Sequence, residues 1–288
     1  MPQRKPVIAE LPEPEEIDFG ALAREYIDGQ VDLVVVLGPT ASGKTRYAVQ
    51  LANEINACAA LGLFEGCPGR MTDSPIIEGA EIISADSRQV YKGMDIGTGK
   101  DLSEYGDVPY HLIDILPAGA QYNVFQYQQD FRRAWADIRS RSMVPILCGG
   151  TGMYINAVTA GYDFSSKSAL SAERGPSRAE GLPQHPYFIG TLVSREVRNE
   201  RIDRRLDARL KEGMVEEIQG LLDSGVPAET LISYGLEYKF VTLYLLGQLS
   251  YGQMREKLAI AIHQFAKRQM TWFRGMERSG VRIHWVEV

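Results

Sequence analysis

The chain of 288 residues is long enough for one large α/β domain, or for a domain with a small appendage. Its hydrophobic share of 44% and charged share of 24% are those of an ordinary globular protein, and no apolar run approaches the roughly 20 residues of a membrane-spanning helix. The net charge of −6 argues against a basic nucleic-acid-binding surface over the whole molecule, although it leaves room for a local basic face.

The cysteines and the N-terminus indicate where the protein works. Cys58 and Cys67 lack the CxxC spacing and the neighbouring histidines of a zinc site, and Cys148 lies in an apolar run that predicts a buried thiol. Arg4 and Lys5 are not followed by an apolar stretch or a small-residue cleavage site, so we expect no signal peptide. We expect a cytoplasmic protein, a monomer, with no membrane partner.

The first predicted elements follow an N-terminal extension at 1–30. Proline and glutamate predict disorder at 1–14, and apolar spacing predicts a short helix at 15–28. The continuous apolar run at 33–37 predicts a buried parallel strand. A helix is expected at 44–55.

The middle of the chain alternates between strands and helices. Residues 57–79 show no period and contain several glycines, which predicts an irregular excursion. Strands are expected at 81–84, 111–115 and 144–148, and a helix is expected at 123–140.

The C-terminal half is predicted to be mostly helical. Serine, glycine and alanine at 163–185 predict a loop. Two strands are expected, at 187–193 and 281–286. Between them the pattern predicts helices that are interrupted at 225–227 and at 235.

Residues 38–45 match the phosphate-binding pattern G-x-x-x-x-G-K-[ST] and lie between a predicted strand and a predicted helix. Glycines let backbone N–H groups converge on phosphate oxygens at the positive end of the helix, and Lys44 adds a mobile charge. The Thr45 hydroxyl is placed to bind Mg²⁺. The pattern predicts a site for a pyrophosphate-bearing molecule formed by Gly38, Thr40, Ala41, Ser42, Gly43, Lys44 and Thr45.

Strands that alternate with helices around such a loop predict an α/β fold. We expect a doubly wound parallel sheet, similar to that of the P-loop NTPases, with a helical C-terminal part. Ligands of such sheets bind beyond the carboxyl ends of the strands, so candidate residues are sought there.

Two further strand ends carry candidate residues. Asp86 directly follows the strand at 81–84, whereas Asp114 falls inside the one at 111–115 and is assigned a structural role. The alternative for Asp86 is a helix N-cap. The turn Gly149-Gly150-Thr151-Gly152 follows the strand at 144–148, and its glycines let the backbone approach a ligand beside the Thr151 hydroxyl. A tight strand–helix turn is the alternative there.

Cations lie on two of the predicted C-terminal helices. Arg198, Arg201 and Arg205 fall three and four apart, on one helix face beside an apolar stripe. Arginines so placed can lean over a phosphate cleft, although a solvated charged face is the better interpretation for most of them. Residues 267–274 mix cations with aromatics, which suits nucleic acid. The spacing of Trp272 nevertheless predicts a place in the core.

At this point the sequence resembles the tRNA dimethylallyltransferases (isopentenyl transferases). The matching stretches run in family order and are residues 38–45, 83–100 (ISADSRQVYKGMDIGTGK), 111–114 (HLID), 149–154 (GGTGMY) and 266–274 (AKRQMTWFR). The second stretch is long and specific.

The resemblance implies that a dimethylallyl group passes from dimethylallyl diphosphate to the exocyclic amine of an adenine. In tRNA this adenine lies beside the anticodon and is flipped into a channel. Asp86 is then the general base on the amine. Lys44, Thr151 and Arg205 stabilise the departing pyrophosphate, Arg205 being the last residue of Arg201-Ile202-Asp203-Arg204-Arg205.

The resemblance also implies an acceptor site and a cofactor. The residues implied to surround the adenine are Asp86, Ser87, Arg88 and Gln89. Mg²⁺ would join the diphosphate to the Thr45 hydroxyl.

The sequence departs from the family in three places. Residues 163–185 are far too short for the helical insertion with which the bacterial enzymes grip tRNA, residues 235–239 replace a Gly-Tyr-Lys-Glu type segment, and the excursion at 57–79 is extra. We therefore expect 31–288 to form a single P-loop α/β catalytic domain with a reduced insertion at 163–185. The missing insertion leaves the acceptor open.

Four functions were weighed. The first is prenylation of tRNA, because residues 267–274 follow the tRNA enzymes. The second is prenylation of a free adenine nucleotide, as in cytokinin-forming relatives. The third is an ATP-dependent P-loop kinase, which residues 86–89 disfavour. The fourth is a non-catalytic tRNA-binding homologue, which the retained Lys44, Asp86, Thr151 and Arg205 disfavour. The expected partners are dimethylallyl diphosphate and tRNA, with Mg²⁺ as cofactor.

Overall fold

The computed structural model describes residues 12–62, 77–160 and 180–288. Most of the segments expected to be disordered (1–14), irregular (57–79) and loop-like (163–185) therefore lie outside the described residues.

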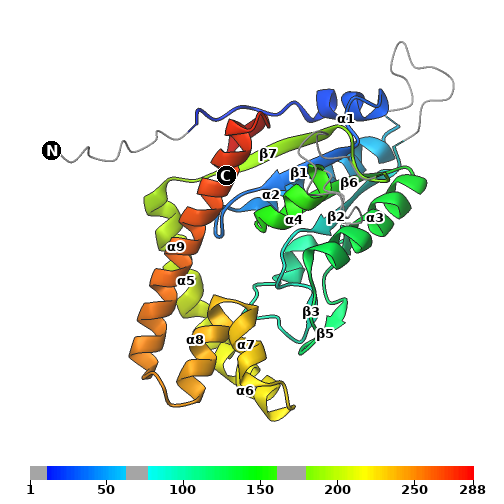
Figure 1. The fold of residues 1–288 in the computed structure, drawn as a ribbon. Coiled ribbons are helices and arrows are strands. Elements are labelled where there is room, and N and C mark those ends of the chain that lie inside the picture. Colours follow the sequence, from blue (N-terminus) through cyan, green and yellow to red (C-terminus); the bar gives the residue numbers. More distant parts are fainter. Residues whose placement is uncertain (1–11, 63–76, 161–179) are drawn as a thin grey trace, which may run out of the picture.

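Six parallel strands form the central sheet in the order β4-β2-β6-β1-β7-β8 (Figure 1). They are β1 (Leu33–Leu37), β2 (Gly79–Ser84), β4 (Tyr110–His111), β6 (Met143–Gly149), β7 (Pro186–Leu192) and β8 (Ile283–Glu287). Every pair runs parallel, and β1 lies inside the sheet with all five residues buried, as its unbroken apolar run predicts. The predicted α/β parallel sheet is confirmed.

Helices cover both faces of the sheet. One face packs against α1 (Phe19–Ile27) and α2 (Lys44–Ala60), and the other against α3 (Val124–Ser140), α4 (Gly152–Thr159) and the C-terminal half of α9 (Tyr251–Arg278). The sequence marks the start of α3 with a capping box, in which Asn123 and Gln126 each accept a backbone N–H of the other.

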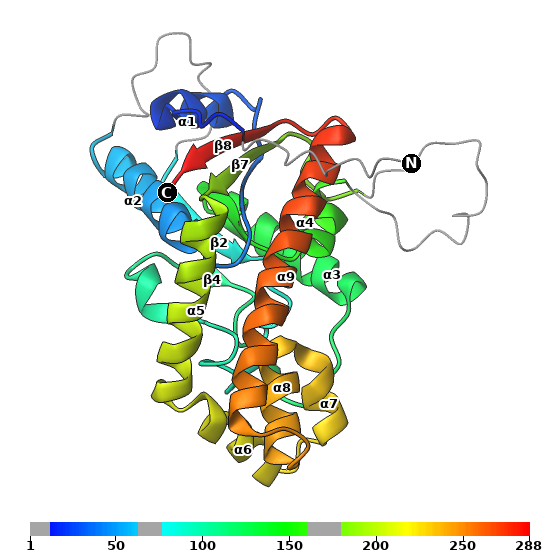
Figure 2. The same ribbon diagram turned by 90° about the vertical axis from the view of Figure 1, so that its left-hand side faces the viewer.

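The helical part forms a second body beside the sheet (Figure 1). It consists of α5 (Arg195–Glu212), α6 (Met214–Asp223), α7 (Ala228–Tyr234), α8 (Leu236–Leu245) and the N-terminal half of α9, which share a core of their own. Helix α9 has 28 residues and runs from this body to the sheet (Figure 2). The predicted interruptions at 225–227 and 235 are confirmed, whereas those at Gly213 and at 246–250 were not predicted.

Two expectations are wrong in detail. Helix α2 continues to Ala60, so residues 57–60 are helical and do not belong to the excursion. The strand expected at 111–115 ends at His111, because Leu112 and Asp114 have positive φ angles of 62° and 56°. A separate pair of short strands consists of β3 (Tyr91–Lys92), which precedes β4 in the chain, and β5 (Leu116–Pro117), which follows it. Asp114 therefore lies in a turn, where its carboxylate contacts the Lys100 ammonium.

The N-terminal helix is part of the packed structure. Asp18 caps α1 by accepting the Ala21 N–H at 2.9 Å, and Leu22 and Ile27 are buried in the same core as β1. The Glu15 N–H also donates to the Trp285 carbonyl at 2.6 Å. The predicted helix at 15–28 is confirmed.

Candidate functional site

Three loops meet at the carboxyl edge of the sheet because their strands are neighbours. Leu37 of β1 lies level with Gly149 of β6, and Ser84 of β2 lies level with Cys148. The loops after β1, β2 and β6 therefore start side by side. Backbone bonds join the last two, since the Thr151 N–H donates to the Ala85 carbonyl at 3.1 Å.

The P-loop after β1 has the geometry of an anion site. Gly43 adopts a left-handed φ of 83° immediately before α2, which only glycine tolerates without strain, and the first turn of α2 follows. Ser42 fixes the loop to β7 through a 2.6 Å hydrogen bond between its hydroxyl and that of Thr191. The backbone N–H groups at the start of α2 are thus left to bind a ligand anion.

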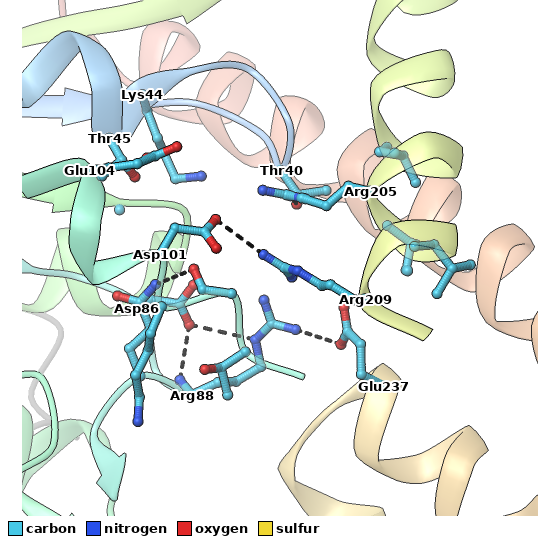
Figure 3. Close-up of a pocket in the computed structure, with 18 of the residues that line it drawn as sticks. Thr40, Lys44, Thr45, Asp86, Arg88, Asp101, Glu104, Arg205, Arg209 and Glu237 are labelled. Atoms are coloured by element: carbon cyan, nitrogen blue, oxygen red, sulfur yellow. Dashed lines mark hydrogen bonds and ion pairs between the residues drawn. The ribbon is translucent and has the colours of Figure 1, made fainter. Parts of the chain in front are cut away.

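Two cations lie at the P-loop: Lys44 belongs to the loop, and Arg205 reaches it from α5 (Figure 3). The Lys44 ammonium lies 3.5 Å from the Pro39 carbonyl, and Arg205 of α5 donates from Nη2 to the Thr40 hydroxyl at 2.7 Å. Burial lowers the pKa of Lys44, and burial together with the neighbouring Arg209 lowers the pKa of Arg205 to about 10. Both shifts mean that burial disfavours the charged forms of the two side chains, and a bound anion would stabilise those charged forms.

A cavity lined by 21 residues, here called the large cavity, opens beside these cations. It carries Thr40, Lys44 and Thr45 from the P-loop, and Arg205 and Arg209 from α5. Its remaining lining is Asp86, Arg88, Gln89, Thr98, Gly99, Lys100, Asp101, Glu104, Tyr105, Cys148, Gly149, Ile202, Leu206, Met214, Glu237 and Ile262. Five cations, four carboxylates and a few apolar side chains line it, which suits an anionic head group near the P-loop and a short hydrocarbon tail.

A second cavity lined by nine residues, here called the small cavity, adjoins the first at Asp86 and Arg88. It is lined by Asp86, Ser87, Arg88, Thr151, Tyr234, Gly235, Leu236, Phe265 and Gln269. Asp86 and Arg88 line both cavities, so they form the wall between them. Aromatic and aliphatic side chains with a few amides and hydroxyls suit a planar heterocycle.

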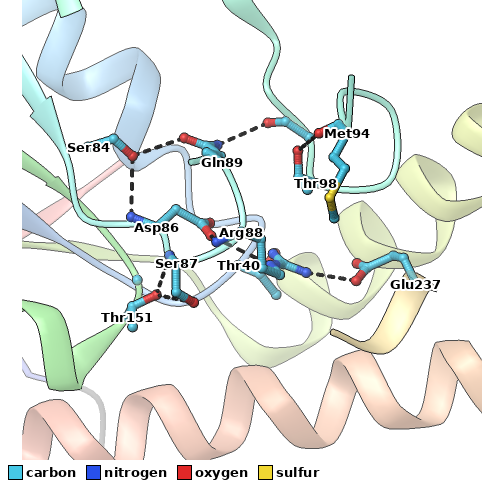
Figure 4. A network of polar contacts seen from close by, with 12 residues as sticks. Thr40, Ser84, Asp86, Ser87, Arg88, Gln89, Met94, Thr98, Thr151 and Glu237 are labelled. Atoms are coloured by element: carbon cyan, nitrogen blue, oxygen red, sulfur yellow. Dashed lines mark hydrogen bonds and ion pairs between the residues drawn. The ribbon is translucent and has the colours of Figure 1, made fainter. Parts of the chain in front are cut away.

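The residues of that wall are held by polar contacts (Figure 4). The Asp86 Oδ1 atom accepts the Arg88 N–H at 3.0 Å and lies 3.5 Å from Arg88 Nε. Arg88 Nη1 donates in turn to Glu237 of α8 at 2.7 Å. Within the described residues, every recorded contact of the Asp86 carboxylate uses Oδ1, and no helix starts at Asp86. The N-cap alternative is therefore excluded.

The other sequence-predicted residues divide between the two cavities. Thr151 accepts the Ser87 N–H at 3.1 Å, and both residues line the small cavity. Gln89 lines the large cavity, where its amide lies 3.4 Å from the Gly99 carbonyl. Thr151 is thus brought close to Asp86 but does not line the large cavity with Lys44.

Gln269 was not assigned a role from the sequence, yet it joins two site loops. Its Oε1 accepts the Thr40 N–H at 2.8 Å, and its Nε2 donates to the Gly150 carbonyl at 2.9 Å. The signal was a glutamine on an otherwise apolar helix face, where it is 8% exposed. Trp272 corrects another expectation, since it is 44% exposed over Gly152 instead of lying in the core.

The large cavity also offers oxygen ligands for a hard cation. The Thr45 hydroxyl and the carboxylates of Asp101 and Glu104 line it. No cluster of three or more His, Cys, Asp or Glu side chains suited to a metal occurs in the described residues. These side chains fit Mg²⁺ only if a ligand phosphate supplies further oxygens, which is how proteins usually bind that ion.

Among the described helices, none combines the length and the apolar character needed to cross a membrane.

Fold and site together define a P-loop α/β protein with two adjoining cavities at the carboxyl edge of its sheet. The family model "IPP transferase" matches residues 89–180 and 167–276. The chain belongs to this family.

Known proteins agree with this assignment. The chain is 47% identical over 305 residues to tRNA dimethylallyltransferase 1 of Porphyromonas gingivalis (88% of this chain, 93% of the relative), and 44% identical over 306 residues to tRNA dimethylallyltransferase 1 of Parabacteroides distasonis (89% and 92%). The crystal structure of a tRNA isopentenylpyrophosphate transferase from Bacillus halodurans matches with a TM-score of 0.70 and 28% identity, over 88% of this chain and 89% of that one.

Proposed function

We infer that this protein transfers a dimethylallyl group from dimethylallyl diphosphate to the exocyclic amine of an adenosine in tRNA, the one next to the anticodon. The observation that carries this inference is that Asp86 and Arg88 line two cavities at once, one that contains the P-loop cations and one that contains the rings of Tyr234 and Phe265. A reaction that joins two substrates needs two cavities that adjoin at shared residues, because both reacting atoms must meet there. The names of the relatives support the choice of tRNA as acceptor.

On the donor side, the diphosphate binds at the N-terminus of α2. The ammonium of Lys44 and the guanidinium of Arg205 approach it from opposite sides. Negative charge grows on the leaving diphosphate as its C–O bond breaks, and preorganised cations stabilise that charge. Mg²⁺, held by the Thr45 hydroxyl and the diphosphate, would supply further charge neutralisation when bound.

On the acceptor side, the adenine leaves its base stack and enters the small cavity. The Phe265 ring and Leu236 offer apolar faces, and Ser87 and Thr151 offer polar groups to the base edge. The amine nitrogen forms a bond to C1 of the dimethylallyl group as pyrophosphate departs. The proton that the amine loses passes to Asp86, whose Oδ2 has no recorded protein partner in the described residues.

Acceptor choice separates this function from its rivals. Labelled dimethylallyl diphosphate is incubated with unmodified tRNA, with AMP and with ATP, and label is expected in tRNA alone. Label in AMP but not in tRNA would show prenylation of a free nucleotide. ATP turnover without any prenyl transfer would show a kinase.

A further inference from the structure

One carboxylate of the helical part binds backbone N–H groups of a site loop. Glu217 of α6 accepts the N–H of Asp95 at 2.8 Å and of Ile96 at 2.7 Å on Oε2. Its Oε1 accepts the Gly97 N–H at 3.1 Å and the Tyr238 hydroxyl at 2.8 Å. Both carboxylate oxygens are thus used by donors, three of them successive backbone amides.

Successive N–H groups that converge on one point form a concave anion site. Here the anion is supplied by the protein, from a helix more than 100 residues further along the chain. Only a carboxylate satisfies all four donors, because an amide in its place would direct an NH₂ group at a donor. Loss of an acceptor for charge-assisted bonds is more costly than loss of an ordinary one.

The loop that Glu217 holds leads directly into the large cavity. Residues 95–100 fold back on themselves, since the Gly99 N–H donates to the Asp95 carbonyl at 3.0 Å. Gly99 then lies against the Arg209 guanidinium so closely that a Cβ atom there would collide with it. Thr98, Gly99 and Lys100 all line the large cavity, and none of them lines the small cavity.

We propose that Glu217 is a positioning residue for the donor side of the reaction. It fixes the backbone of residues 95–97, which holds Gly99 against Arg209 and so sets the wall of the large cavity. The proposal rests on the proposed function for its kinetic consequence. Its structural consequence, protection of three named amides, does not depend on which reaction the protein catalyses.

The first test is hydrogen–deuterium exchange of the full chain, with Glu217→Gln compared with the unaltered protein. Exchange at the amides of 95–97 is expected to become roughly tenfold faster, the loss of about one charge-assisted bond. Glu216→Gln is the matched control, because both glutamates lie in the first turn of α6 and lose the same interaction with the helix dipole. Unchanged exchange at 95–97 in Glu217→Gln would overturn the proposal.

The second test is kinetic and separates positioning from general destabilisation. In Glu217→Gln, the KM for dimethylallyl diphosphate is expected to rise about tenfold, while the KM for tRNA stays the same. A merely unstable variant would lower the active fraction and leave both KM values unchanged, and that result would contradict the proposal. If the unaltered protein transfers no label to tRNA, the proposed function fails, and the exchange measurement still decides on Glu217.

A milder variant covers the case in which Glu217→Gln does not fold. Tyr238→Phe removes one of the four donors and leaves the carboxylate in place. Without the Tyr238 hydroxyl, the position of Oε1 is less firmly fixed, and so is its bond to the Gly97 amide. Faster exchange is therefore expected at Gly97, with little change at Ile96. Equal exchange at Gly97 in this variant and in the unaltered protein would count against the proposal.

Discussion

Asp86 is a single carboxylate that lines two cavities. One of its oxygens is committed to Arg88, which fixes the orientation of the group, and the other has no recorded partner in the described residues. An acid held in this way can accept a proton on one side of the wall while the leaving group departs on the other.

Substitution Asp86→Asn tests this role. The amide keeps the size of the side chain but cannot take the proton, so transfer is expected to fall by roughly 10²–10⁴-fold. Binding of pyrophosphate, measured by calorimetry, should stay within about twofold, because the diphosphate is held by Lys44 and Arg205. Asp107→Asn, at an exposed position, is the control. Unchanged turnover in Asp86→Asn would refute the general-base role.

The lowered pKa of Lys44 predicts a pH dependence of donor binding. The protonated ammonium binds the diphosphate, and burial makes it lose its proton at a lower pH than an ordinary lysine. Affinity for pyrophosphate is therefore expected to fall as pH rises through this lowered pKa. A bound anion raises the pKa of Lys44, and the affinity stops falling once the pH exceeds that higher pKa. Lys44→Arg should remove most of this dependence, and comparison on the same ligand cancels the ligand's own ionisation. Parallel pH profiles of the two proteins would contradict the assignment.

The substitution Gln269→Glu is expected to lower stability and transfer by more than its added charge alone would. In Gln269→Glu the carboxylate cannot donate to the Gly150 carbonyl, so two site loops lose their link. The free energy of unfolding is expected to fall by about 1–3 kcal/mol, and transfer should fall with it. Gln264→Glu, exposed on the same helix, introduces the same charge and should change neither quantity. Equal effects of the two substitutions, measured by urea denaturation, would count against the clamp.

At the scale of elements, the ion pair between Arg88 and Glu237 connects the loop after β2 with α8. The two side chains are 17% and 10% exposed, so each depends on the other for compensation of its charge. Residues 235–239, which depart from the family pattern, thus still deliver a carboxylate to the site wall.

Substitution Glu237→Gln tests the connection. It removes one of the two carboxylates that contact the Arg88 guanidinium, Asp86 being the other, and the free energy of unfolding is expected to fall by about 1–3 kcal/mol. Lys239→Gln, exposed on the same helix, should leave stability unchanged. A stable Glu237→Gln protein with normal transfer would show that the pair is dispensable.

Most elements could be predicted from the sequence because local rules and tertiary packing agree there. The unbroken apolar run of β1 and the capping box of α3 are examples. The expected strand at 111–115 failed because packing overrode the pattern. The Asp114 N–H donates to the Gln89 carbonyl at 3.0 Å and its carboxylate contacts Lys100, which holds a left-handed turn that no local signal marks.

At the scale of the whole molecule, the predictable part of the site is the part carried by strand ends. The P-loop, Asp86 and the turn at 149–152 follow strands that lie side by side. Arg209, Glu217 and Gln269 come from helices far along the chain. Gln269 contacts the P-loop and the turn at 149–152, whereas Glu217 and Arg209 contact residues 95–101, and all of these contacts arise only through the packing of the helical part. A pattern of helix periodicity shows which face is apolar but not which loop a polar residue on that face contacts.

The overall charge of −6 makes tRNA binding depend on local cations. Lys267 and Arg268 are exposed on α9, and Arg268 lies over the Phe265 ring that lines the small cavity. In a double variant, Lys267→Gln with Arg268→Gln, the slope of log KM for tRNA against log salt concentration should fall by about 1–2. Lys257→Gln, near the other end of α9, should leave the slope unchanged. An unaltered slope in the double variant would place the tRNA elsewhere.

Helix α9 is held at the site by Gln269 and extends from there to the far end of the helical part. At about 1.5 Å per residue, its 28 residues span about 42 Å, and Gln269 holds it about 27 Å from its first turn. A tilt of about 5° around Gln269 therefore moves that first turn by about 2 Å, far more than the P-loop itself would move. A spectroscopic label at Tyr251, which is 47% exposed at the outer end, would consequently register such a tilt as an amplified displacement.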